Sequence, residues 1–334
     1  MIRLDNIRAT PSAANFPIFQ RLAGGHPQDE TDLHAASFAV ADQGSLGSCT
    51  AYSIAGRLAD LLGIDFSEQF LYNVTRLLIE NRHGDVGATL GDAMQAAVQL
   101  GVAREELCRY MSIGVDDMPT DDAFADALTH RVTLVERVAA PQRDAMYRSQ
   151  DESECIIADI EACLSSGRSV NISMQIGQQT RYLAGPWQTH ELLPCTGLAG
   201  MGGRNPYWGG HALILVGHNS KIPNAGRIRP GKFLARNSWG PIWADGGYFG
   251  INYETLTNDL IEAFVISGAG NVQIDASWYS EAEVKGWYKR LNFCPDAGGV
   301  LYWRNPANGG FRVFCGTVLG ETKKNVGNLF PVFV

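Results

Sequence analysis

A cysteine, a histidine and an asparagine occupy places in this sequence where the three could share one reaction. Cys49 opens a stretch with apolar residues at helical spacing, which predicts a helix from Cys49 to Leu62 that ends at Gly63. A thiol at a helix N-terminus lies near the positive end of the backbone dipole, which favours the nucleophilic thiolate. For a cysteine without partners, a buried packing position is the more ordinary interpretation.

Cys49 has candidate partners elsewhere in the chain. His211 precedes the apolar run 212–216, which predicts a buried strand with the imidazole held at its edge. Asn237 follows a second short apolar run, and Gln43, six residues before Cys49, can bring a side-chain amide to the same point as a hydrogen-bond donor. A nucleophile, a base and a residue that orients the base are the components of acyl transfer to a thiol.

The motifs around these residues, taken together, are specific. They are Gly-Ser-Cys at 47–49, Asp-Phe-Ser-Glu-Gln at 65–69, Gly-Gly-His-Ala at 209–212, Asn-Ser-Trp-Gly at 237–240 and Gly-Gly-Tyr-Phe-Gly at 246–250. In this order, and with Gln43 ahead of them, they resemble the papain-like cysteine peptidases over residues 32–267. The resemblance implies an α+β fold with a helical lobe that carries Cys49 and a β-barrel-like lobe that carries His211 and Asn237.

The same resemblance implies a role for each residue of the site. Cys49 and His211 would form a thiolate–imidazolium pair, and Asn237 would accept a hydrogen bond from the far ring nitrogen. The Gln43 amide and the Cys49 backbone N–H would form an oxyanion hole. Residues expected near the substrate are Gly87 and Ala88 along its backbone, Ala212 and Ser173 at the main specificity pocket, and Trp239 over the histidine–asparagine bond.

Three functions from different classes remain open at this level. The first is an endopeptidase, and the second is another acyl transfer on the same triad, such as deamidation, transamidation or isopeptide cleavage. The third is a catalytically silent binding module, whose usual sign, replacement of the cysteine, histidine or glutamine, is missing here. One departure from the family is Leu46, which stands where secreted relatives have one end of a disulfide.

Composition argues against several other classes of protein. The formal charge is 27 − 35 = −8, which argues against nucleic acid or an anionic membrane surface as a partner. No apolar run approaches the ~18 residues that span a bilayer, and no Sec signal peptide opens the chain. The seven cysteines have no metal-ligand spacing, so we expect neither metal nor cofactor. A cytoplasmic protein, or one exported without a Sec signal, is expected, typical of a bacterial family member acting on a protein or peptide substrate.

The chain divides by composition into three parts: an arm at 1–31, a catalytic domain at 32–267 and a small β-rich module at 268–334. The arm carries apolar residues between prolines, and relatives have inhibitory prosegments there. It would therefore either occlude the cleft of a zymogen or follow the outside of the domain. Expected elements are helices at 67–81 (capped by Asp65 with Glu68), 91–100, 120–130 and 154–166, strands at 132–138 and 169–176, and a hairpin of 301–304 with 311–315.

Overall fold

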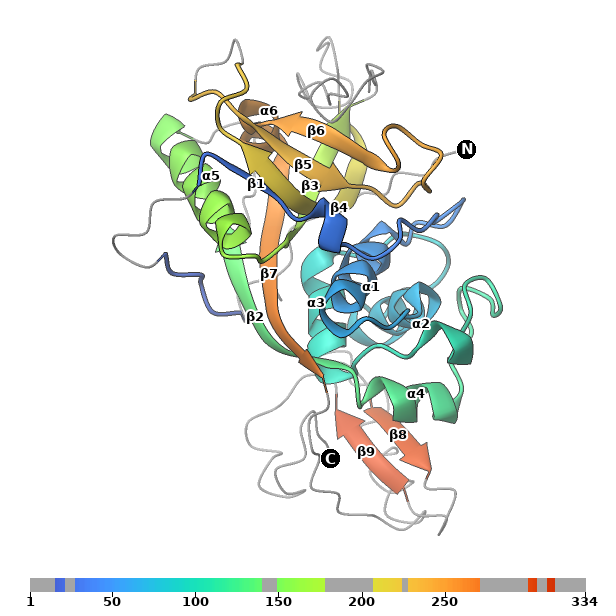
Figure 1. Ribbon diagram of the computed structural model, residues 1–334. Coiled ribbons are helices and arrows are strands. Elements are labelled where there is room, and N and C mark those ends of the chain that lie inside the picture. Colours follow the sequence, from blue (N-terminus) through green and yellow to red (C-terminus); the bar gives the residue numbers. More distant parts are fainter. Residues whose placement is uncertain are drawn as a thin grey trace.

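The computed structural model describes residues 16–21, 28–139, 149–177, 207–223 and 228–270, and the backbone of two further strands at 300–304 and 311–315. Most of the helices form one lobe, and an antiparallel sheet with helices α5 and α6 forms the other, as Figure 1 shows. The expected α+β, two-lobed fold is confirmed. Among the described residues, no helix has both the length and the apolar character needed to cross a membrane.

The helical lobe is built around α1. Its elements are η2 His34–Ala36, α1 Cys49–Leu62, α2 Glu68–Val74, the π-helix η3 Thr75–Ile79, α3 Leu90–Gln99, η4 Glu105–Leu107 and α4 Asp121–Ala127. Most residues of α1 are buried, so apolar residues occupy more than one face of this helix. Gly63 ends α1 as predicted, because its φ of 68° lies in the left-handed region and its N–H bonds to the carbonyl of Ala59.

The predicted helix at 67–81 is wrong in two details. Ser67, rather than Asp65, caps it: the Ser67 hydroxyl accepts the Phe70 N–H at 2.9 Å. The helix also widens after Val74, where the Glu80 N–H bonds to the carbonyl of Thr75, five residues back. The residues of η3 therefore point in directions that a regular helix would not give them.

The sheet lobe has the strand order β2-β7-β3-β4-β5-β6, with β1 paired to β4. Its elements are β1 Glu30–Asp32, β2 Arg131–Ala139, α5 Gln150–Ser165, β3 Val170–Gly177, β4 Tyr207–Asn219, β5 Lys232–Arg236, β6 Tyr248–Asn252, α6 Tyr253–Asp259 and β7 Leu260–Gly270. Helix α5 begins four residues before the predicted start, because Ser149 and Glu152 form a capping box. Strand β4 also begins earlier than predicted, so His211 pairs with Met174 inside the sheet and does not stand at a strand edge.

The two lobes meet where α1 packs against β4. The Ser53 hydroxyl donates to the Leu213 carbonyl at 2.9 Å, and Asn171 of β3 donates to the Ser53 carbonyl at 2.7 Å. Deeper in the interface, Arg236 forms a two-pronged ion pair with Asp60, and both side chains are about 5% exposed or less. These contacts hold α1, from Ser53 to Asp60, against strands β3, β4 and β5.

The described part of the N-terminal arm follows the outside of the sheet lobe. Residues 16–21 run beside the edge strand β2, where the Phe19 N–H donates to the Arg137 carbonyl at 2.9 Å and the Arg137 N–H to the Pro17 carbonyl at 2.7 Å. The Phe19 ring is buried in the sheet-lobe core under the guanidinium of Arg168. Residues 16–21 thus take the outside course; residues 1–15 and 22–27, on which occlusion of the cleft also depends, lie outside the described part of the chain.

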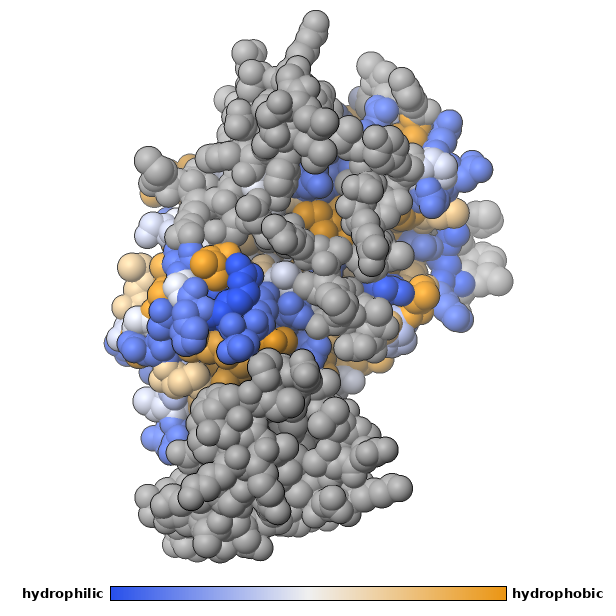
Figure 2. Space-filling view, turned by 180° about the vertical axis from the view of Figure 1, so that it is seen from behind, coloured by the Kyte–Doolittle hydropathy of each residue, from blue (hydrophilic) through white to orange (hydrophobic). Residues whose placement is uncertain are grey.

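The predicted C-terminal hairpin is confirmed. Strands β8 Val300–Arg304 and β9 Phe311–Cys315 pair antiparallel, and β8 lies beside α4 in Figure 1. The opposite side of the molecule is seen in Figure 2, where the described surface of the helical lobe, at the left, is mainly hydrophilic. That surface agrees with the ordinary content of charged residues, 19% of the chain.

Candidate active site

The turn before α1 places Cys49 at the interface between the lobes. Gly44 has a φ of 56°, in the region that glycine adopts without strain, and it lets the chain reverse before the helix. Cys49 is the first residue of α1 and is 2% exposed. It packs against Ala212 and Ile261, so the thiol lies beside the residue that follows His211 on β4.

The histidine and the asparagine are hydrogen-bonded to each other. His211 Nε2 lies 2.8 Å from Asn237 Oδ1, and the Asn237 side chain is held in turn by the Ser238 N–H, which donates to the same oxygen at 2.8 Å. The Trp239 ring stacks on the imidazole, with the ring centroids 4.9 Å apart and the planes 28° from parallel. This arrangement fixes the orientation of the imidazole and covers the bond from one side.

Burial decides the charge of His211 in this arrangement. The side chain is 1% exposed, and the loss of hydration lowers its pKa to about 4, although the bond to Asn237 acts in the opposite direction. Its other ring nitrogen, Nδ1, makes no hydrogen bond to any described residue. The imidazole alone is therefore neutral at pH 7, and the expected imidazolium requires the negative charge of a thiolate beside it to offset the cost of burial.

Gln43 connects the two sides of the site. It is fully buried; its Nε2 donates to the Leu46 carbonyl at 2.8 Å, and its Oε1 accepts the Ser238 hydroxyl at 2.5 Å. The backbone N–H of Gln43 also bonds to the Ser238 carbonyl at 2.8 Å. Because a side-chain amide nitrogen carries two hydrogens, the bond to Leu46 leaves the second one available to another acceptor.

The residues expected near the substrate fall into two groups. Ser173 and Ala212 are direct neighbours across the β3–β4 ladder, and both are buried, so they lie together on the sheet side of the Cys49 contact. Gly87 and Ala88 belong to the helical lobe, where the Gly87 N–H is engaged by the Tyr72 hydroxyl at 3.1 Å and Ala88 is 3% exposed. The second group therefore offers less free backbone to a peptide than the sequence suggested.

Sequence reasoning missed three residues that hold the turn before Cys49. Ser238 orients the Gln43 amide, and its signal was its place in the Asn-Ser-Trp-Gly motif. Tyr110 donates to the Gln43 carbonyl at 2.7 Å and contacts the Ser48 hydroxyl at 2.8 Å; nothing in its sequence neighbourhood pointed to it. The third, Asp85, accepts the Gly47 N–H at 3.0 Å, and its only signal was its place two residues before Gly87.

Comparison with known proteins identifies the family of this chain. The model of the papain family cysteine proteases matches residues 28–268. The chain belongs to the papain family of cysteine proteases. No three histidine, cysteine, aspartate or glutamate side chains of the described ranges gather as a metal site would require.

Individual relatives are distant. The chain is 24% identical over 226 residues to an uncharacterized peptidase C1-like protein of Acanthamoeba polyphaga mimivirus, covering 65% of each. It is 27% identical over 126 residues to serine-repeat antigen protein 5 of Plasmodium falciparum, which is 37% of this chain and only 12% of that protein.

Among solved structures, xylellain, a cysteine protease from Xylella fastidiosa, superposes with a TM-score of 0.60 at 21% identity, covering 82% of this chain and 99% of xylellain. Digestive procathepsin L 3 of Tenebrio molitor gives 0.53 at 17% identity, with 78% and 75% covered. At these identities the structural likeness establishes the fold alone.

Proposed function

We propose that this chain is a cysteine endopeptidase that hydrolyses peptide bonds through Cys49, His211 and Asn237. The observation that carries the proposal is the oriented imidazole: His211 is hydrogen-bonded to Asn237 at 2.8 Å and stacked on Trp239, on the strand against which Cys49 packs. The positive end of the α1 dipole favours the thiolate at that point. Membership of the papain family supports the same chemistry.

The proposed reaction has two halves. The Cys49 thiolate attacks the carbonyl carbon of the peptide bond, and the negative charge moves to the carbonyl oxygen, where the Gln43 amide and the Cys49 N–H stabilise it. The C–N bond then breaks as the His211 imidazolium gives its proton to the leaving amine, and a thioester remains. Water loses a proton to His211, attacks the thioester and releases the acid, which restores the thiolate and the imidazolium.

The test is covalent labelling of the thiol together with peptide cleavage. A cysteine-directed epoxide should label Cys49, and short fluorogenic peptides should be cleaved; Cys49→Ala should abolish both, and His211→Ala should nearly do so. Cys155→Ala is the matched control, because Cys155 is a free, exposed cysteine on α5. Near-normal turnover in Cys49→Ala would refute the mechanism.

The other two functions are outcomes of the same test. Labelling of Cys49 without cleavage of any peptide would contradict peptidase activity in favour of another acyl transfer. A well-folded wild-type protein that is neither labelled nor active would indicate a binding module. Asn237 and Gln43 variants then distinguish orientation of the base from stabilisation of the oxyanion, because loss of one oxyanion donor costs about 3–4 kcal/mol in the barrier.

We also propose that the N-terminal arm is a prosegment and that residues 268–334 form a module without catalytic residues. Residues 16–21 anchor the arm on the β2 edge, and the family match begins at residue 28, just before β1 joins the sheet. Procathepsins are among the structures with this fold. The arm would thus be removable without loss of a sheet strand, although the division at residue 31 cuts through β1.

Deletion of residues 2–27 tests the prosegment. The truncated protein should react faster with the epoxide than the full-length chain, and Phe19→Ala in the full-length chain should give an intermediate rate by weakening the anchor. Equal labelling rates in a well-folded truncated protein would show that the arm is not an inhibitor. Truncation after Gly270 should leave the turnover of the remaining domain intact.

A further inference from the structure

The carboxylate of Asp85 joins the turn before Cys49 to a loop of the helical lobe. Its Oδ1 accepts the backbone N–H of Gly47 at 3.0 Å and the hydroxyl of Tyr72 at 2.5 Å. Gly47 is two residues before Cys49 and just before the N-cap Ser48, where a helix start presents N–H groups without partners in the helix. A charged acceptor at this point makes a hydrogen bond stronger than a neutral one.

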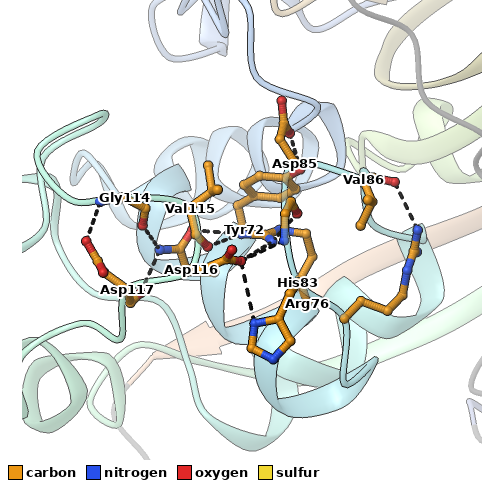
Figure 3. A network of polar contacts seen from close by, with 12 residues as sticks. Tyr72, Arg76, His83, Asp85, Val86, Gly114, Val115, Asp116 and Asp117 are labelled. Atoms are coloured by element: carbon orange, nitrogen blue, oxygen red, sulfur yellow. Dashed lines mark hydrogen bonds and ion pairs between the residues drawn. The ribbon is translucent and has the colours of Figure 1, made fainter.

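The loop that carries Asp85 is itself fixed by a buried arginine. Arg76 of η3 is fully buried, donates to the Gly84 carbonyl at 2.5 Å and to the Val115 carbonyl, and lies over the Tyr72 ring with its guanidinium carbon 4.2 Å from the centroid. Figure 3 shows these contacts converging on the loop, with Asp85 beside Tyr72. Asp85 is therefore held in place independently of the turn before Cys49 and would not move with that turn.

Asp116 closes the loop from the other side. Its carboxylate accepts the Gly84 N–H at 2.7 Å and lies 3.5 Å from Arg76, as the dashed lines in Figure 3 indicate. The Tyr72 hydroxyl, besides donating to Asp85, accepts the Gly87 N–H at 3.1 Å. The backbone groups of Gly84 and the N–H of Gly87, on either side of Asp85, are thus hydrogen-bonded within the protein. Such a paired network is what a rigid support requires.

We infer that Asp85 is a positioning residue for the nucleophile. It holds the Gly47–Cys49 turn where the Cys49 thiol can attack the substrate carbonyl and the Cys49 backbone N–H can serve as an oxyanion donor. The inference rests on the proposed role of Cys49. Leu46 stands in this turn where secreted relatives have a cysteine of a disulfide, so a polar anchor fixes the turn here. Its partner atoms are a backbone N–H and a tyrosine hydroxyl, and both lose their acceptor if the carboxylate is removed.

The expected effect is on turnover more than on substrate binding. Asp85 acts on the turn through the Gly47 backbone, and its loss leaves the Gly47 N–H and the Tyr72 hydroxyl without this acceptor, so the turn relaxes. A misplacement of about 1 Å in a catalytic group costs on the order of 10²-fold in rate. Asp85→Ala should therefore lower kcat by roughly 10- to 100-fold and change KM by less than about threefold.

The experiment compares four proteins: wild type, Asp85→Ala, Asp85→Asn and Asp117→Ala. The Asp85→Asn side chain retains an acceptor oxygen and should restore kcat to within about tenfold of wild type, because a neutral hydrogen bond is roughly half as strong as a charge-assisted one. Asp117 is the matched control, since its carboxylate accepts the Gly114 N–H at 2.7 Å within its own loop. Asp117→Ala should have the wild-type kcat.

A second measurement does not depend on activity. Hydrogen–deuterium exchange of a peptide covering residues 44–49 should become faster in Asp85→Ala than in Asp117→Ala. If Asp85→Ala does not fold, Tyr72→Phe takes its place: it removes one of the two donors, and it should lower kcat less than the loss of the whole carboxylate would.

Wild-type kcat in folded Asp85→Ala, or unchanged exchange at 44–49, would overturn the positioning role. A wild-type protein that is neither labelled nor active would instead refute the proposed function, and the exchange experiment would still decide whether Asp85 anchors the turn.

Discussion

Glu68 gives the sharpest quantitative prediction for the stability of this protein. Glu68 is the first residue of α2 and is 8% exposed, and it lines a cavity of about 30 Å³ shared with Tyr52, Asn237 and Ser238. Burial raises the pKa of Glu68 from 4.5 to about 8, with the charge of Glu105 adding to the effect. At pH 7 the group is therefore neutral in the folded protein and ionised in the unfolded chain.

The magnitude follows from the two pKa values. Because the folded pKa lies above the unfolded one, the folded state binds the extra proton, and stability is lost as the pH rises from 4.5 towards 8. The loss is about 3 kcal/mol at pH 7 and about 5 kcal/mol at pH 9, at about 1.4 kcal/mol for each pKa unit. Glu68→Gln cannot ionise, so it should be more stable than wild type by these amounts and nearly equal to it at pH 4.5.

The assay is urea denaturation of the wild-type and Glu68→Gln proteins at intervals from pH 5 to pH 9. The difference in the free energy of unfolding should widen steadily with pH up to about 8 and then stay constant. Glu106→Gln is the control, because the Glu106 side chain is 62% exposed and solvent screens its ion pair with Arg104. Parallel pH curves for wild type and Glu68→Gln would refute the account of a neutral buried carboxyl.

Three further predictions concern other parts of the molecule. Asp60→Asn should lower the free energy of unfolding by about 3–5 kcal/mol in urea titrations, because it leaves the buried Arg236 guanidinium without its counter-charge. Asn237→Ala should lower kcat by about 10²-fold with little change in KM for a fluorogenic peptide, because the imidazole loses its orienting acceptor. Gly101→Ala should lower the melting temperature by several degrees, because φ is 78° and the added Cβ would lie 1.8 Å from a carbonyl oxygen of α4.

Sequence reasoning succeeded where the determining interactions are local. The limits of α1 were predictable because its apolar spacing and Gly63 are read within a few residues of each other. The strand after His211 was predictable from a continuous apolar run. The order of the motifs, matched to a family, supplied the two lobes and predicted the contact between His211 and Asn237 that the structure contains.

Sequence reasoning failed where contacts between segments far apart in the chain determine the local structure. In η3, where the helix widens, the buried guanidinium of Arg76 donates to carbonyls in two separate loops. The anchoring of the turn before Cys49 depends on Asp85 and Tyr110, 38 and 62 residues away from the turn residues that they contact. No periodicity or local propensity records such contacts, because they exist only after the segments have come together.

The hydrogen bonds between Gln43 and Ser238 make the active site a joint product of the two lobes. Gln43 belongs to the chain that enters α1, and Ser238 follows β5, beside the residue that orients His211. For the proposed peptidase, separation of the lobes removes the support of the oxyanion donor and parts the thiol from the base in one step. A chain whose lobes have not yet packed together, or have separated on heating, is therefore expected to be inactive as a peptidase.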